Sequence, residues 1–516
     1  MLTNWAQIKE QLLRSNFKLP ATAQMVQDSR KLKPGDVFVA LVGYLTDGSR
    51  FVDKAIHSGA SLILVSSNCD EVHYQNRGAQ GAPLLVIEDL ETNLPSIARE
   101  FYEFEQNRMP IVGITGTNGK TSISHFLAQL SELANSQHLA VIGTMGTGRI
   151  DQLVPAENTT PGVTEVYQLI QQFSRDSKTN YSGVAMEVSS HALHQSRVKG
   201  ISFDVGIFTN LTLDHLDYHG SMEQYFAAKA KLFTEYATKR AVINIDDEFG
   251  QRLLDMLPEY ALAVAVGRSK QVKAYSDYVH IVDSECHAQG IILSLDWQIG
   301  GHRDFIELQL PIFGEFNGFN IAAVFATSIL LGWSVQATHF SFLKSVPGRL
   351  EMYVQPKLPI AVVDYAHTPD ALEQSIQSLR QHCSGEIYTI FGCGGDRDRS
   401  KRRVMAEIAE RLSDHVIITN DNPRTESQER IVADILTGLT GQHKVIYDRK
   451  EAIVDTLLRA KAEDTILIAG KGHETYQIIG PVSHEYDERA FTNQILQALA
   501  DGKDIRLELE KIKAGL

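Results

Sequence analysis

The segment Gly113–Ser122, GITGTNGKTS, has the residue types and spacing of a loop that binds phosphate groups. Glycines let backbone N–H groups turn toward phosphate oxygens, Lys120 can reach terminal phosphates, and the Thr121 hydroxyl can bind Mg²⁺. The longer form of the motif requires glycine where this chain has Ile114, so only the shorter form G-x-x-G-K-T is present. A structural Gly-Lys turn is the alternative. The motif favours a nucleoside triphosphate, bound by Gly116, Thr117, Asn118, Gly119, Lys120, Thr121 and Ser122.

The residues around this loop predict the elements that hold it in place. An apolar run over 110–114 is typical of a buried strand, and apolar residues at helical spacing follow the loop. These are Phe126, Leu127, Leu130 and Leu133. The order strand, loop, helix is the one in which a helix N-terminus faces the bound phosphates.

Two later strand-like runs also end in residues that could do chemistry. Glu187 follows the run 182–185, and His215 follows the run 205–208 within the stretch NLTLDHLDYHG. A carboxylate and an imidazole at strand ends suit a metal ion beside phosphate groups. Taken singly, each residue has an ordinary alternative: an ion-paired carboxylate for Glu187 and a hydrogen-bonded histidine for His215.

These three stretches, in this order, resemble the Mur ligase family, ATP-dependent enzymes that extend the peptide of the bacterial cell-wall precursor one amino acid at a time. The resemblance covers roughly residues 25 to 495. It implies ATP and Mg²⁺ as cofactors and a reaction in which the γ-phosphate of ATP moves to a substrate carboxylate. The incoming amine then attacks the acyl phosphate, and cations around the developing negative charge assist the transfer.

The resemblance also predicts an unusual lysine. Lys229, in the stretch YFAAK, occupies the position at which family members carry a carbamylated lysine that acts as a metal ligand. Carbamylation requires a neutral amine, and therefore surroundings that disfavour the charged form. A solvated helix lysine beside Lys231 is the alternative. The predicted catalytic residues are Lys120, Glu187, His215 and Lys229, and the predicted metal ligands are Thr121, Glu187, His215 and carbamylated Lys229.

The linking segment 314–323, GEFNGFNIAA, resembles the family stretch in which two asparagines lie near the nucleotide. An amide can both donate to and accept from a base edge, and helix capping is the alternative. The segment 347–351, PGRLE, resembles the opening of the last family domain, whose arginine meets ATP phosphates on domain closure. The resemblance thus adds four residues to the ATP site, Asn317, Asn320, Arg349 and Asp364.

After Arg349, apolar runs alternate regularly with helical patterns, which predicts a parallel sheet covered by helices. The runs are 360–363, 387–391, 416–419 and 466–469, and each ends in a polar motif. In such a sheet the ligand crevice lies outside the carboxyl ends of the strands. The four motifs should therefore converge on one substrate site.

One of these motifs, DNPR at 421–424, resembles the family version that admits meso-diaminopimelate rather than lysine. Diaminopimelate has a second carboxylate, which the Arg424 guanidinium can bind through two hydrogen bonds, while Glu474 can take the distal ammonium. Lysine would leave that arginine unpaired at a cost of about 3 kcal/mol. A structural arginine is the alternative. The predicted diaminopimelate site comprises Arg397, Asp421, Asn422, Pro423, Arg424, Gly470 and Glu474.

The other substrate is expected to bind near the N-terminal end of the chain. The segments 28–30, 35–40 and 43–48 resemble the family region that holds the UDP end of the precursor, although ordinary turn chemistry would also explain them. Residues 44–46 differ from the expected loop residues. The resemblance predicts contacts to UDP-MurNAc-L-Ala-D-Glu from Ser29, Tyr44, Leu45, Thr46, Asn158, Thr159, Thr160, Ser189, Gln195 and Arg197.

The chain of 516 residues is too long for one hydrophobic core, and its patterns predict an α/β protein of three domains. Residues 1–109 would form an N-terminal α/β domain that binds the UDP precursor, and residues 110–346 a central P-loop domain with a parallel sheet. Residues 347–516 would form a Rossmann-like domain that binds the amino acid. Residues 270–307 are strand-like without identifiable chemistry, and the charged tail after Asp501 is expected to be an exposed helix.

Composition argues against several classes of partner. The net charge is -14 and no stretch concentrates basic residues, which argues against nucleic acid. No apolar run is long enough to span a membrane. The four cysteines, at 69, 286, 383 and 393, lack a C-x-x-C motif and fit buried or incidental thiols in a reducing compartment. We expect a cytoplasmic monomer.

Three other functions compete with this reading of the motifs. A lysine-adding relative and a glutamate-adding, folylpolyglutamate-synthase-like ligase share the same chemistry, and the DNPR motif argues against both. A nucleotide-binding switch protein without ligase chemistry is the third, and it would have no use for the strand-end motifs of the last domain. The expected function is therefore ATP-dependent addition of meso-diaminopimelate to UDP-MurNAc-L-Ala-D-Glu.

Overall fold

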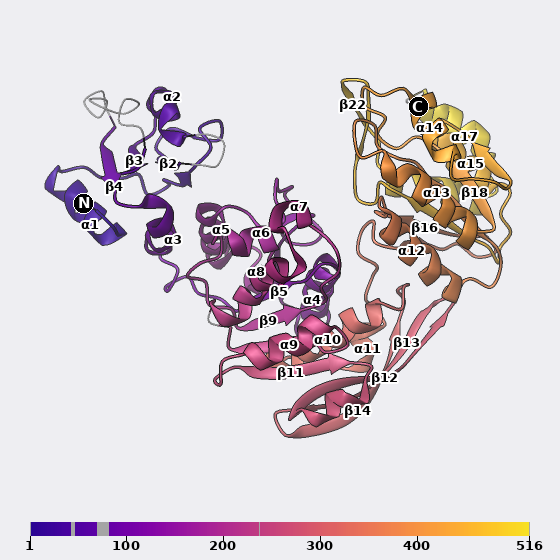
Figure 1. Ribbon diagram of the computed structural model, residues 1–516, viewed down its shortest axis with the longest axis horizontal. Helices are drawn as coiled ribbons and strands as arrows, with labels where there is room; N and C mark the ends of the chain where they lie inside the picture. Colours follow the sequence, from indigo (N-terminus) through magenta and orange to yellow (C-terminus); the bar gives the residue numbers. More distant parts are fainter. Residues whose placement is uncertain (1, 43–46, 70–81, 237, 515–516) are drawn as a thin grey trace. The chain divides into compact units, whose positions relative to one another are not determined.

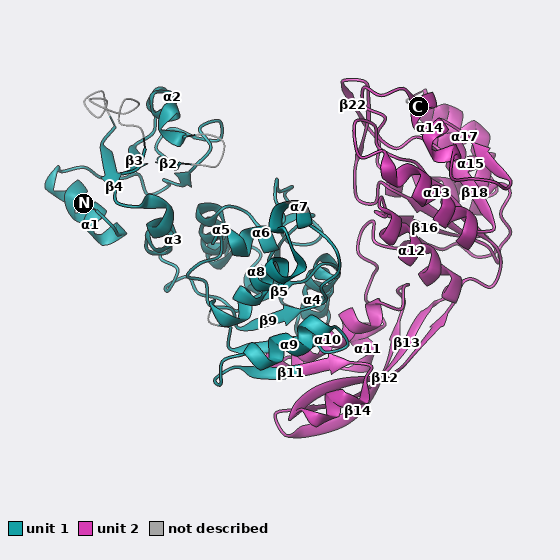
Figure 2. Cartoon of the chain, in the orientation of Figure 1, with its two compact units in different colours: residues 1–264 teal, residues 265–516 magenta. Residues whose placement is uncertain are grey.

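The computed structural model describes residues 2–42, 47–69, 82–236 and 238–514. The chain divides into two compact units, unit 1 (residues 1–264) and unit 2 (residues 265–516), which Figure 2 colours separately. Three predicted precursor contacts lie outside the described residues, namely Tyr44, Leu45 and Thr46. The predicted domain boundaries at 109 and 346 stay predictions.

The N-terminal part of unit 1 is a small parallel sheet with helices beside it (Figure 1). Its strands are mostly buried and rich in Val, Ile and Leu, as expected for parallel strands that are covered on both faces. In spatial order they are β1 (Met25–Val26), β2 (Val37–Ala40), β3 (Leu62–Ser66) and β4 (Leu84–Ile87). The helices are α1 (Trp5–Arg14), α2 (Val52–His57) and α3 (Leu90–Phe101), with a 3₁₀ turn at Gly48–Phe51.

The central sheet of unit 1 carries the phosphate-binding loop. Its strands run parallel except for the last, which pairs antiparallel with its neighbour. In spatial order they are β10 (Arg240–Asn244), β9 (Val205–Phe208), β5 (Ile111–Thr115), β8 (Tyr181–Glu187), β6 (His138–Gly143) and β7 (Gly146–Gly148). The helices are α4 (Lys120–Asn135), α5 (Val163–Arg175), α6 (Ser190–His194), α7 (Leu216–His219), α8 (Met222–Thr234) and α9 (Glu248–Met256). Strands β5, β8 and β9 confirm the three strands predicted before the chemical motifs.

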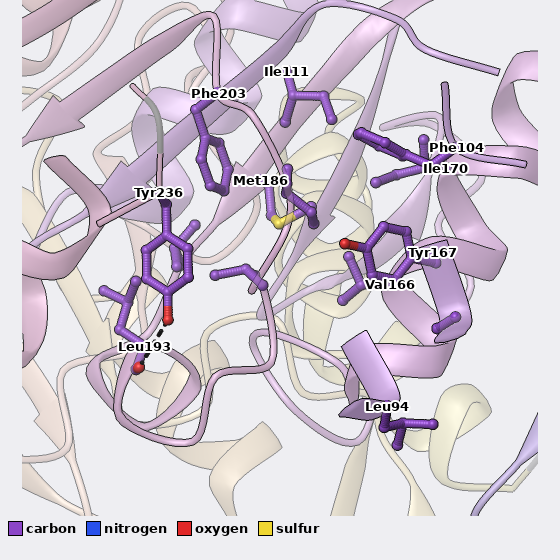
Figure 3. Close-up of a cluster of buried hydrophobic side chains, with 14 of the residues drawn as sticks. Leu94, Phe104, Ile111, Val166, Tyr167, Ile170, Met186, Leu193, Phe203 and Tyr236 are labelled. Atoms are coloured by element: carbon purple, nitrogen blue, oxygen red, sulfur yellow. Dashed lines mark hydrogen bonds between the residues drawn. The ribbon is translucent and has the colours of Figure 1, made fainter. Parts of the chain in front are cut away.

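One hydrophobic core runs through both parts of unit 1. It includes Leu94 of α3, Tyr167 of α5 and Met186 of β8, and Figure 3 shows part of this cluster. The ring of Tyr236 also belongs to it, and the Tyr236 hydroxyl donates a hydrogen bond to the Leu193 carbonyl at 3.3 Å. Because this core is continuous, the N-terminal sheet and the phosphate loop belong to one compact unit.

Unit 2 begins with an antiparallel sheet and a buried helix. Consecutive strands pair in the order β12 (Asp277–His287), β13 (Gly290–Ile299) and β14 (His302–Leu310). The predicted strands over 270–307 are confirmed from residue 277 onward. Residues 270–274 form a 3₁₀ turn instead, because the Ser269 side chain caps it by accepting a hydrogen bond from the Gln271 N–H. The helices that follow are α10 (Asn317–Leu330) and α11 (Ala337–Phe340), and the strand that crosses the boundary between the units is β11 (Leu262–Gly267).

The C-terminal part of unit 2 is the predicted parallel sheet with helices packed against it (Figure 1). In spatial order its strands are β15 (Glu351–Tyr353), β16 (Ile360–Asp364), β20 (Thr465–Ala469), β17 (Ile387–Phe391), β18 (His415–Ile418) and β19 (His443–Val445). The predicted helices are α12 (Pro369–His382), α13 (Ser400–Leu412), α14 (Gln428–Leu436) and α15 (Arg449–Leu457). The antiparallel β15 and the edge strand β19 were not predicted, because three residues carry too little pattern.

A hairpin and two helices complete unit 2. They are the antiparallel pair β21 (Tyr476–Ile479) and β22 (Val482–Glu485), then α16 (Glu488–Ala500) and α17 (Ile505–Lys513). The prediction that the tail helix is exposed is wrong for one face, because Ile505 and Leu509 are buried where α17 packs on α15 and α16. No described helix of either unit is long and apolar enough to cross a lipid bilayer.

A buried ion pair in unit 2 gives a prediction about stability. The Arg449 guanidinium donates to both carboxylate oxygens of Glu488, and both side chains are almost completely buried. Changing Glu488→Leu leaves the buried charge of Arg449 uncompensated. We therefore expect the free energy of unfolding of unit 2 to fall by about 3 to 5 kcal/mol. The measurement is the unfolding transition followed by calorimetry.

The double variant Arg449→Met with Glu488→Leu is expected to recover most of that loss, because it removes both charges. The matched control is Arg403→Met, which loses only an exposed ion pair with Glu407 and should leave the transition almost unchanged. A transition that does not move in the Glu488 variant would contradict this account of the pair.

Candidate functional site

The phosphate-binding loop connects β5 to α4, as predicted. Gly116 and Gly119 have φ angles of +148° and +88°, which residues with side chains rarely adopt. A Cβ atom on Gly116 would lie 1.8 Å from the hydroxyl oxygen of Thr209, so no larger residue fits there. The loop therefore turns directly into the N-terminus of α4, where backbone N–H groups are available to an anion.

Two lysines meet at the backbone of this loop. Lys120 Nζ donates to the Gly116 carbonyl at 2.9 Å and to the Thr117 carbonyl at 2.8 Å, and Lys229 Nζ donates to the same Gly116 oxygen at 2.8 Å. Lys229 is only 1% exposed, so the alternative of a solvated helix lysine is wrong. Burial first, and then the charge of Lys120, hold the pKa of Lys229 well below its usual value. This is the environment in which a lysine readily becomes a neutral amine.

Glu187, at the end of β8, is fully buried beside the start of α4. Its carboxylate accepts hydrogen bonds from the Thr121 hydroxyl at 3.0 Å and from the N–H and hydroxyl of Thr144 at 3.1 and 3.0 Å. Burial raises the pKa of Glu187, while the charge of Lys120 and these hydrogen bonds act in the opposite direction. A Cβ atom on Gly143 would lie 2.2 Å from Glu187 Oε1, so the end of β6 must be glycine to leave room for the carboxylate.

The predicted metal ligand His215 lies immediately before α7 with its side chain about half exposed. Its ring centre is 4.9 Å from that of His191 and 6.1 Å from that of Tyr225, a residue of the same helix as Lys229. The neighbouring His219 is buried, and burial together with the surrounding histidines lowers its pKa to about 4. His215 is thus part of a group of aromatic rings beside the loop.

The oxygen donors at the start of α4 fit a Mg²⁺ ion bound together with phosphate. The Thr121 hydroxyl and the Glu187 carboxylate lie 3.0 Å apart there. Within the described ranges, no group of three His, Cys, Asp or Glu side chains forms a complete metal site. Mg²⁺ does not require such a group, because it is commonly held by one or two protein oxygens together with phosphate oxygens and water.

The residues predicted to hold the muramoyl peptide form a hydrogen-bonded group next to Glu187. The Thr160 hydroxyl donates to the Glu187 carbonyl at 2.8 Å and accepts from the Ser189 N–H at 3.0 Å. Arg197 donates to the Thr160 carbonyl at 2.8 Å and to the Gln195 side-chain oxygen. Burial lowers the pKa of Arg197. The group therefore extends without interruption from the phosphate loop to Arg197.

A pocket of about 680 Å³ lies within unit 1, next to this group. Its lining includes residues 24–28 of the N-terminal part, and from the central part the predicted contacts Asn158, Gln195 and Arg197. Lys31 also lines it and forms an ion pair with Glu157 at 2.9 Å. Ser29, another predicted contact, is buried and is not part of this lining. The pocket joins residues that the sequence assigned to the two ends of the same precursor.

In unit 2, the four predicted strand-end motifs meet at one edge of the C-terminal sheet. The Gly470 N–H donates to the Asp364 carbonyl at 3.0 Å, and the Gly395 N–H donates to the Asn422 carbonyl at 2.9 Å. A Cβ atom on Gly470 would lie 3.1 Å from Asp421 Oδ2. The motif after β20 therefore also contacts the motif after β18, which links the two hydrogen-bonded pairs. The predicted convergence of the motifs is therefore confirmed.

The β21–β22 hairpin fixes the backbone of the DNPR motif. Arg424 has a φ of +51°, its N–H donates to the Ile478 carbonyl at 3.1 Å, and its carbonyl accepts from the Gly480 N–H at 2.7 Å. The Arg424 guanidinium donates to the Gly395 carbonyl at 3.0 Å. The sequence did not predict this hairpin, whose four-residue strands are short and largely exposed.

Other predicted diaminopimelate contacts lie around this motif. Asn422 Nδ2 donates to Glu474 Oε2 at 3.0 Å, which joins the motifs that follow β18 and β20. A Cβ atom on Gly395 would lie 1.9 Å from the Pro423 carbonyl oxygen, so the two backbones touch. Arg397 is exposed in the segment before α13. Their contact with the amino acid stays a prediction.

The two asparagines of the linking segment are buried at the start of α10. Asn320 Nδ2 donates to Asn317 Oδ1 at 2.8 Å, and Asn317 Nδ2 donates to the Phe313 carbonyl at 2.6 Å. No side chain caps the N-terminus of α10, so the helix-capping alternative is wrong. Contact of these amides with a nucleotide stays a prediction.

The two remaining predicted ATP contacts are linked through the segment before β15. Asp364 accepts hydrogen bonds from the Leu350 N–H at 2.8 Å and from the Ser375 hydroxyl at 2.7 Å. The Arg349 guanidinium lies over the Tyr365 ring, 4.9 Å from its centre. Asp364 thus holds the arginine-bearing segment against the end of β16, and contact of either residue with ATP stays a prediction.

Sequence reasoning missed two residues that contact the predicted site. Thr144, just after β6, holds the Glu187 carboxylate, and its hydroxyl lies 3.1 Å from that of the predicted precursor contact Thr159. Lys471, in the motif after β20, is fully buried and donates to the Glu474 carboxylate. Their positions at the carboxyl ends of parallel strands were the available signal.

Family models match three stretches of this chain. The model for the Mur ligase family, catalytic domain, matches residues 23–102, and that for the Mur ligase middle domain matches residues 114–328. The model for the Mur ligase, glutamate ligase domain, matches residues 348–472. These matches confirm the predicted fold class, an α/β protein built from three domains.

Similar proteins cover nearly the whole chain. A UDP-N-acetylmuramoyl-L-alanyl-D-glutamate--2,6-diaminopimelate ligase of Haemophilus influenzae (strain 86-028NP) is 44% identical over 461 residues, 88% of this chain and 92% of that relative. A protein of the same name from Vibrio vulnificus (strain YJ016) is 43% identical over 91% of this chain and 93% of its own length. A solved structure of a ligase of this name has a TM-score of 0.68 at 32% identity, covering 92% of this chain and 95% of its own. The phosphate loop, the strand-end site and these matches together show that the chain belongs to the Mur ligase family.

Proposed function

We propose that this chain is an ATP-dependent ligase that adds meso-diaminopimelate to UDP-MurNAc-L-Ala-D-Glu during synthesis of the peptidoglycan precursor. Relatives that carry this name match most of the chain at 44% identity. The observation that carries the proposal is the hydrogen-bonded group of unit 1, in which Glu187 connects Thr121 of the phosphate loop to the predicted precursor contact Thr160. We expect the protein to be a cytoplasmic monomer.

The proposed reaction consists of two transfers. A carboxylate oxygen of the D-Glu residue attacks the γ-phosphorus of ATP, and ADP leaves. The amine of diaminopimelate then attacks the acyl carbon, phosphate leaves with the bonding electron pair, and the proton of the amine passes to solvent. Lys120 stabilises the charge that develops on the phosphoryl oxygens, for which its Nζ must leave the carbonyls of Gly116 and Thr117. The backbone N–H groups at the start of α4 bind the phosphates that do not react.

The proposal includes a bound Mg²⁺ ion and a carbamate at Lys229. When bound, Mg²⁺ supplies positive charge to the phosphate oxygens, and Thr121 and Glu187 are the residues that would hold it. The neutral amine of Lys229 can attack CO₂, so that an N–C bond forms and one proton leaves the nitrogen. A carbamate at Lys229 would place an anion beside Lys120, at a position where burial and then the charge of Lys120 disfavour the protonated amine. His215 stays a predicted catalytic residue.

In this proposal, residues of unit 2 select the amino acid that is added. The Arg424 guanidinium would bind the second carboxylate of diaminopimelate, and Glu474 would take its distal ammonium. Contacts to the β21–β22 hairpin fix the backbone of Arg424, and its guanidinium donates a hydrogen bond to the Gly395 carbonyl at 3.0 Å. Lysine would leave the guanidinium without a carboxylate partner.

A substrate panel tests this specificity. ADP and phosphate release should require both UDP-MurNAc-L-Ala-D-Glu and meso-diaminopimelate, and kcat/KM for lysine should be lower by roughly a hundredfold, because the arginine stays unpaired. Arg424→Ala should raise the KM for diaminopimelate and reduce the preference over lysine. Comparable turnover of lysine by the unaltered protein would refute the specificity, and ATP binding without product from any amino acid would favour a nucleotide switch.

Removal of Lys120 tests the phosphate loop. Lys120→Ala should reduce turnover by roughly a hundredfold to a thousandfold, because the cation that stabilises phosphoryl transfer is lost. Coupled-enzyme detection of ADP measures the effect. Lys231→Ala is the matched control, since it removes a partly exposed lysine on α8 that pairs with Glu235 at 3.9 Å. Near-normal activity of the Lys120 variant would show that the loop does not bind the transferred phosphate.

Isotope labelling tests the carbamate. Protein incubated with ¹³C-bicarbonate should show a carbamate carbonyl resonance by NMR, because the buried Lys229 reacts as a neutral amine. Lys229→Arg should remove the resonance and most of the activity, whereas Lys231→Arg should keep both. A resonance that persists in the Lys229 variant would mean that another amine is modified.

A further inference from the structure

Lys471 is a buried cation with no assigned part in the proposed reaction. It follows Gly470 at the end of β20, and its side chain is completely buried. Its Nζ donates to Glu474 Oε2 at 3.0 Å and to Asn422 Oδ1 at 3.2 Å, and it lies 3.8 Å from Asp421 Oδ1. One ammonium group is therefore shared by three side chains from the motifs that follow β18 and β20.

The ammonium and the Ile478 N–H together determine the orientation of the Asn422 amide. Asn422 Oδ1 accepts from Lys471 Nζ and from the Ile478 N–H at 2.9 Å, while Nδ2 donates to Glu474 Oε2 at 3.0 Å. Because an ammonium group can only donate, it requires the oxygen end of the amide on its side. The N–H end is thereby directed at Glu474, which accepts from both neighbours through one oxygen.

The two carboxylates around Lys471, those of Asp421 and Glu474, are suited to a ligand with a positive charge. Asp421 Oδ1 is buried and has no hydrogen-bond partner among the described residues. Asp421 and Glu474 carry two negative charges against the single positive charge of Lys471, so a ligand ammonium would complete the balance. Arg424 of the same motif offers a guanidinium to a carboxylate. A molecule that bears both groups complements the site.

We propose that Lys471 is a positioning residue that sets the selectivity of the amino-acid site for a ligand with a distal ammonium group. It acts through Glu474 and Asn422, which it holds in one orientation, and not through contact with the ligand. The inference rests on the proposed function, because it assigns a role to Lys471 in the recognition of diaminopimelate. It also explains why a lysine is completely buried at the end of β20, where burial of an unpaired charge would be costly.

The test is the variant Lys471→Met, which keeps the length of the side chain and removes its charge. The KM for meso-diaminopimelate should rise at least tenfold, while the KM values for ATP and UDP-MurNAc-L-Ala-D-Glu stay within twofold. The ratio of kcat/KM for diaminopimelate to that for 2-aminopimelate, which lacks the distal ammonium, should fall at least tenfold. An equal rise in all three KM values, or an unchanged ratio, would overturn the proposal.

A double-mutant cycle separates positioning from general packing. If Lys471 acts through Glu474, the variant that combines Lys471→Met with Glu474→Gln should have about the selectivity of Glu474→Gln alone, because the second change removes the group that is positioned. If the two substitutions reduced the selectivity independently, so that the double variant showed the product of the two losses, the proposal would be overturned. Lys444→Met is the matched control, since it removes a lysine paired with Asp455 at 2.7 Å on the edge strand β19 and should behave as the unaltered protein.

Folding is checked by calorimetry for each variant. Lys471→Gln, which keeps a hydrogen-bond donor without the charge, serves if the methionine variant does not fold, and it should show the same change in selectivity. Failure of both variants to fold would overturn the positioning role in favour of a structural one. Absence of diaminopimelate-dependent turnover in the unaltered protein would instead refute the proposed function, so the two failures are distinguishable.

Discussion

The burial of charged groups beside a phosphate-binding loop is the constraint on which unit 1 depends. An ionised side chain away from water is costly unless partners surround it. Glu187 is compensated by hydroxyl and N–H donors from Thr121 and Thr144, whereas Lys229 has the Gly116 carbonyl and the unfavourable charge of Lys120. Burial disfavours the charged form of both groups: it raises the pKa of Glu187, where the charge of Lys120 and the hydrogen bonds act against the shift, and lowers the pKa of Lys229, where the charge of Lys120 adds to the shift.

The same principle organises the C-terminal sheet of unit 2. Arg449 and Lys471 are buried cations, and each contacts residues at or just after the ends of β18 and β20. Arg449 donates to the Ala469 carbonyl at 2.8 Å and to the Asn420 carbonyl at 3.4 Å, while Lys471 donates to side chains of these motifs. Strands β18 and β20 are not neighbours, because β17 lies between them. A long cationic side chain can reach across β17 and so hold the ends of β18 and β20 together.

The proposed chemistry is divided between the two units. Unit 1 carries the phosphate loop, the buried lysine and the group that continues to Arg197, and unit 2 carries the strand-end site with Arg424 and Glu474. Each unit has a continuous set of contacts of its own. A nucleotide switch would need only the first set, so the second is what distinguishes a ligase from such a protein.

Sequence alone determined the motifs and the strands and helices that flank them. The phosphate loop, the runs before Glu187 and His215 and the alternation after Arg349 follow from short local patterns, and the structure has strands at these places. Three-residue strands, the β21–β22 hairpin and the packed face of α17 were missed, because short or largely polar segments carry little periodic signal. The convergence of four motifs could be predicted, since parallel strands place their carboxyl ends at one edge.

Only the tertiary structure decided what surrounds the individual side chains. The sequence offered Lys229 as either a solvated or a buried lysine, and its signal for Thr144 and Lys471 was limited to their positions after parallel strands. Burial, and the identity of the group within hydrogen-bond distance, depend on residues far away in the chain, such as Gly116 for Lys229 and Asn422 for Lys471. The chemistry of a lysine is set by these neighbours, because solvation and nearby charge together determine whether its amine carries a proton.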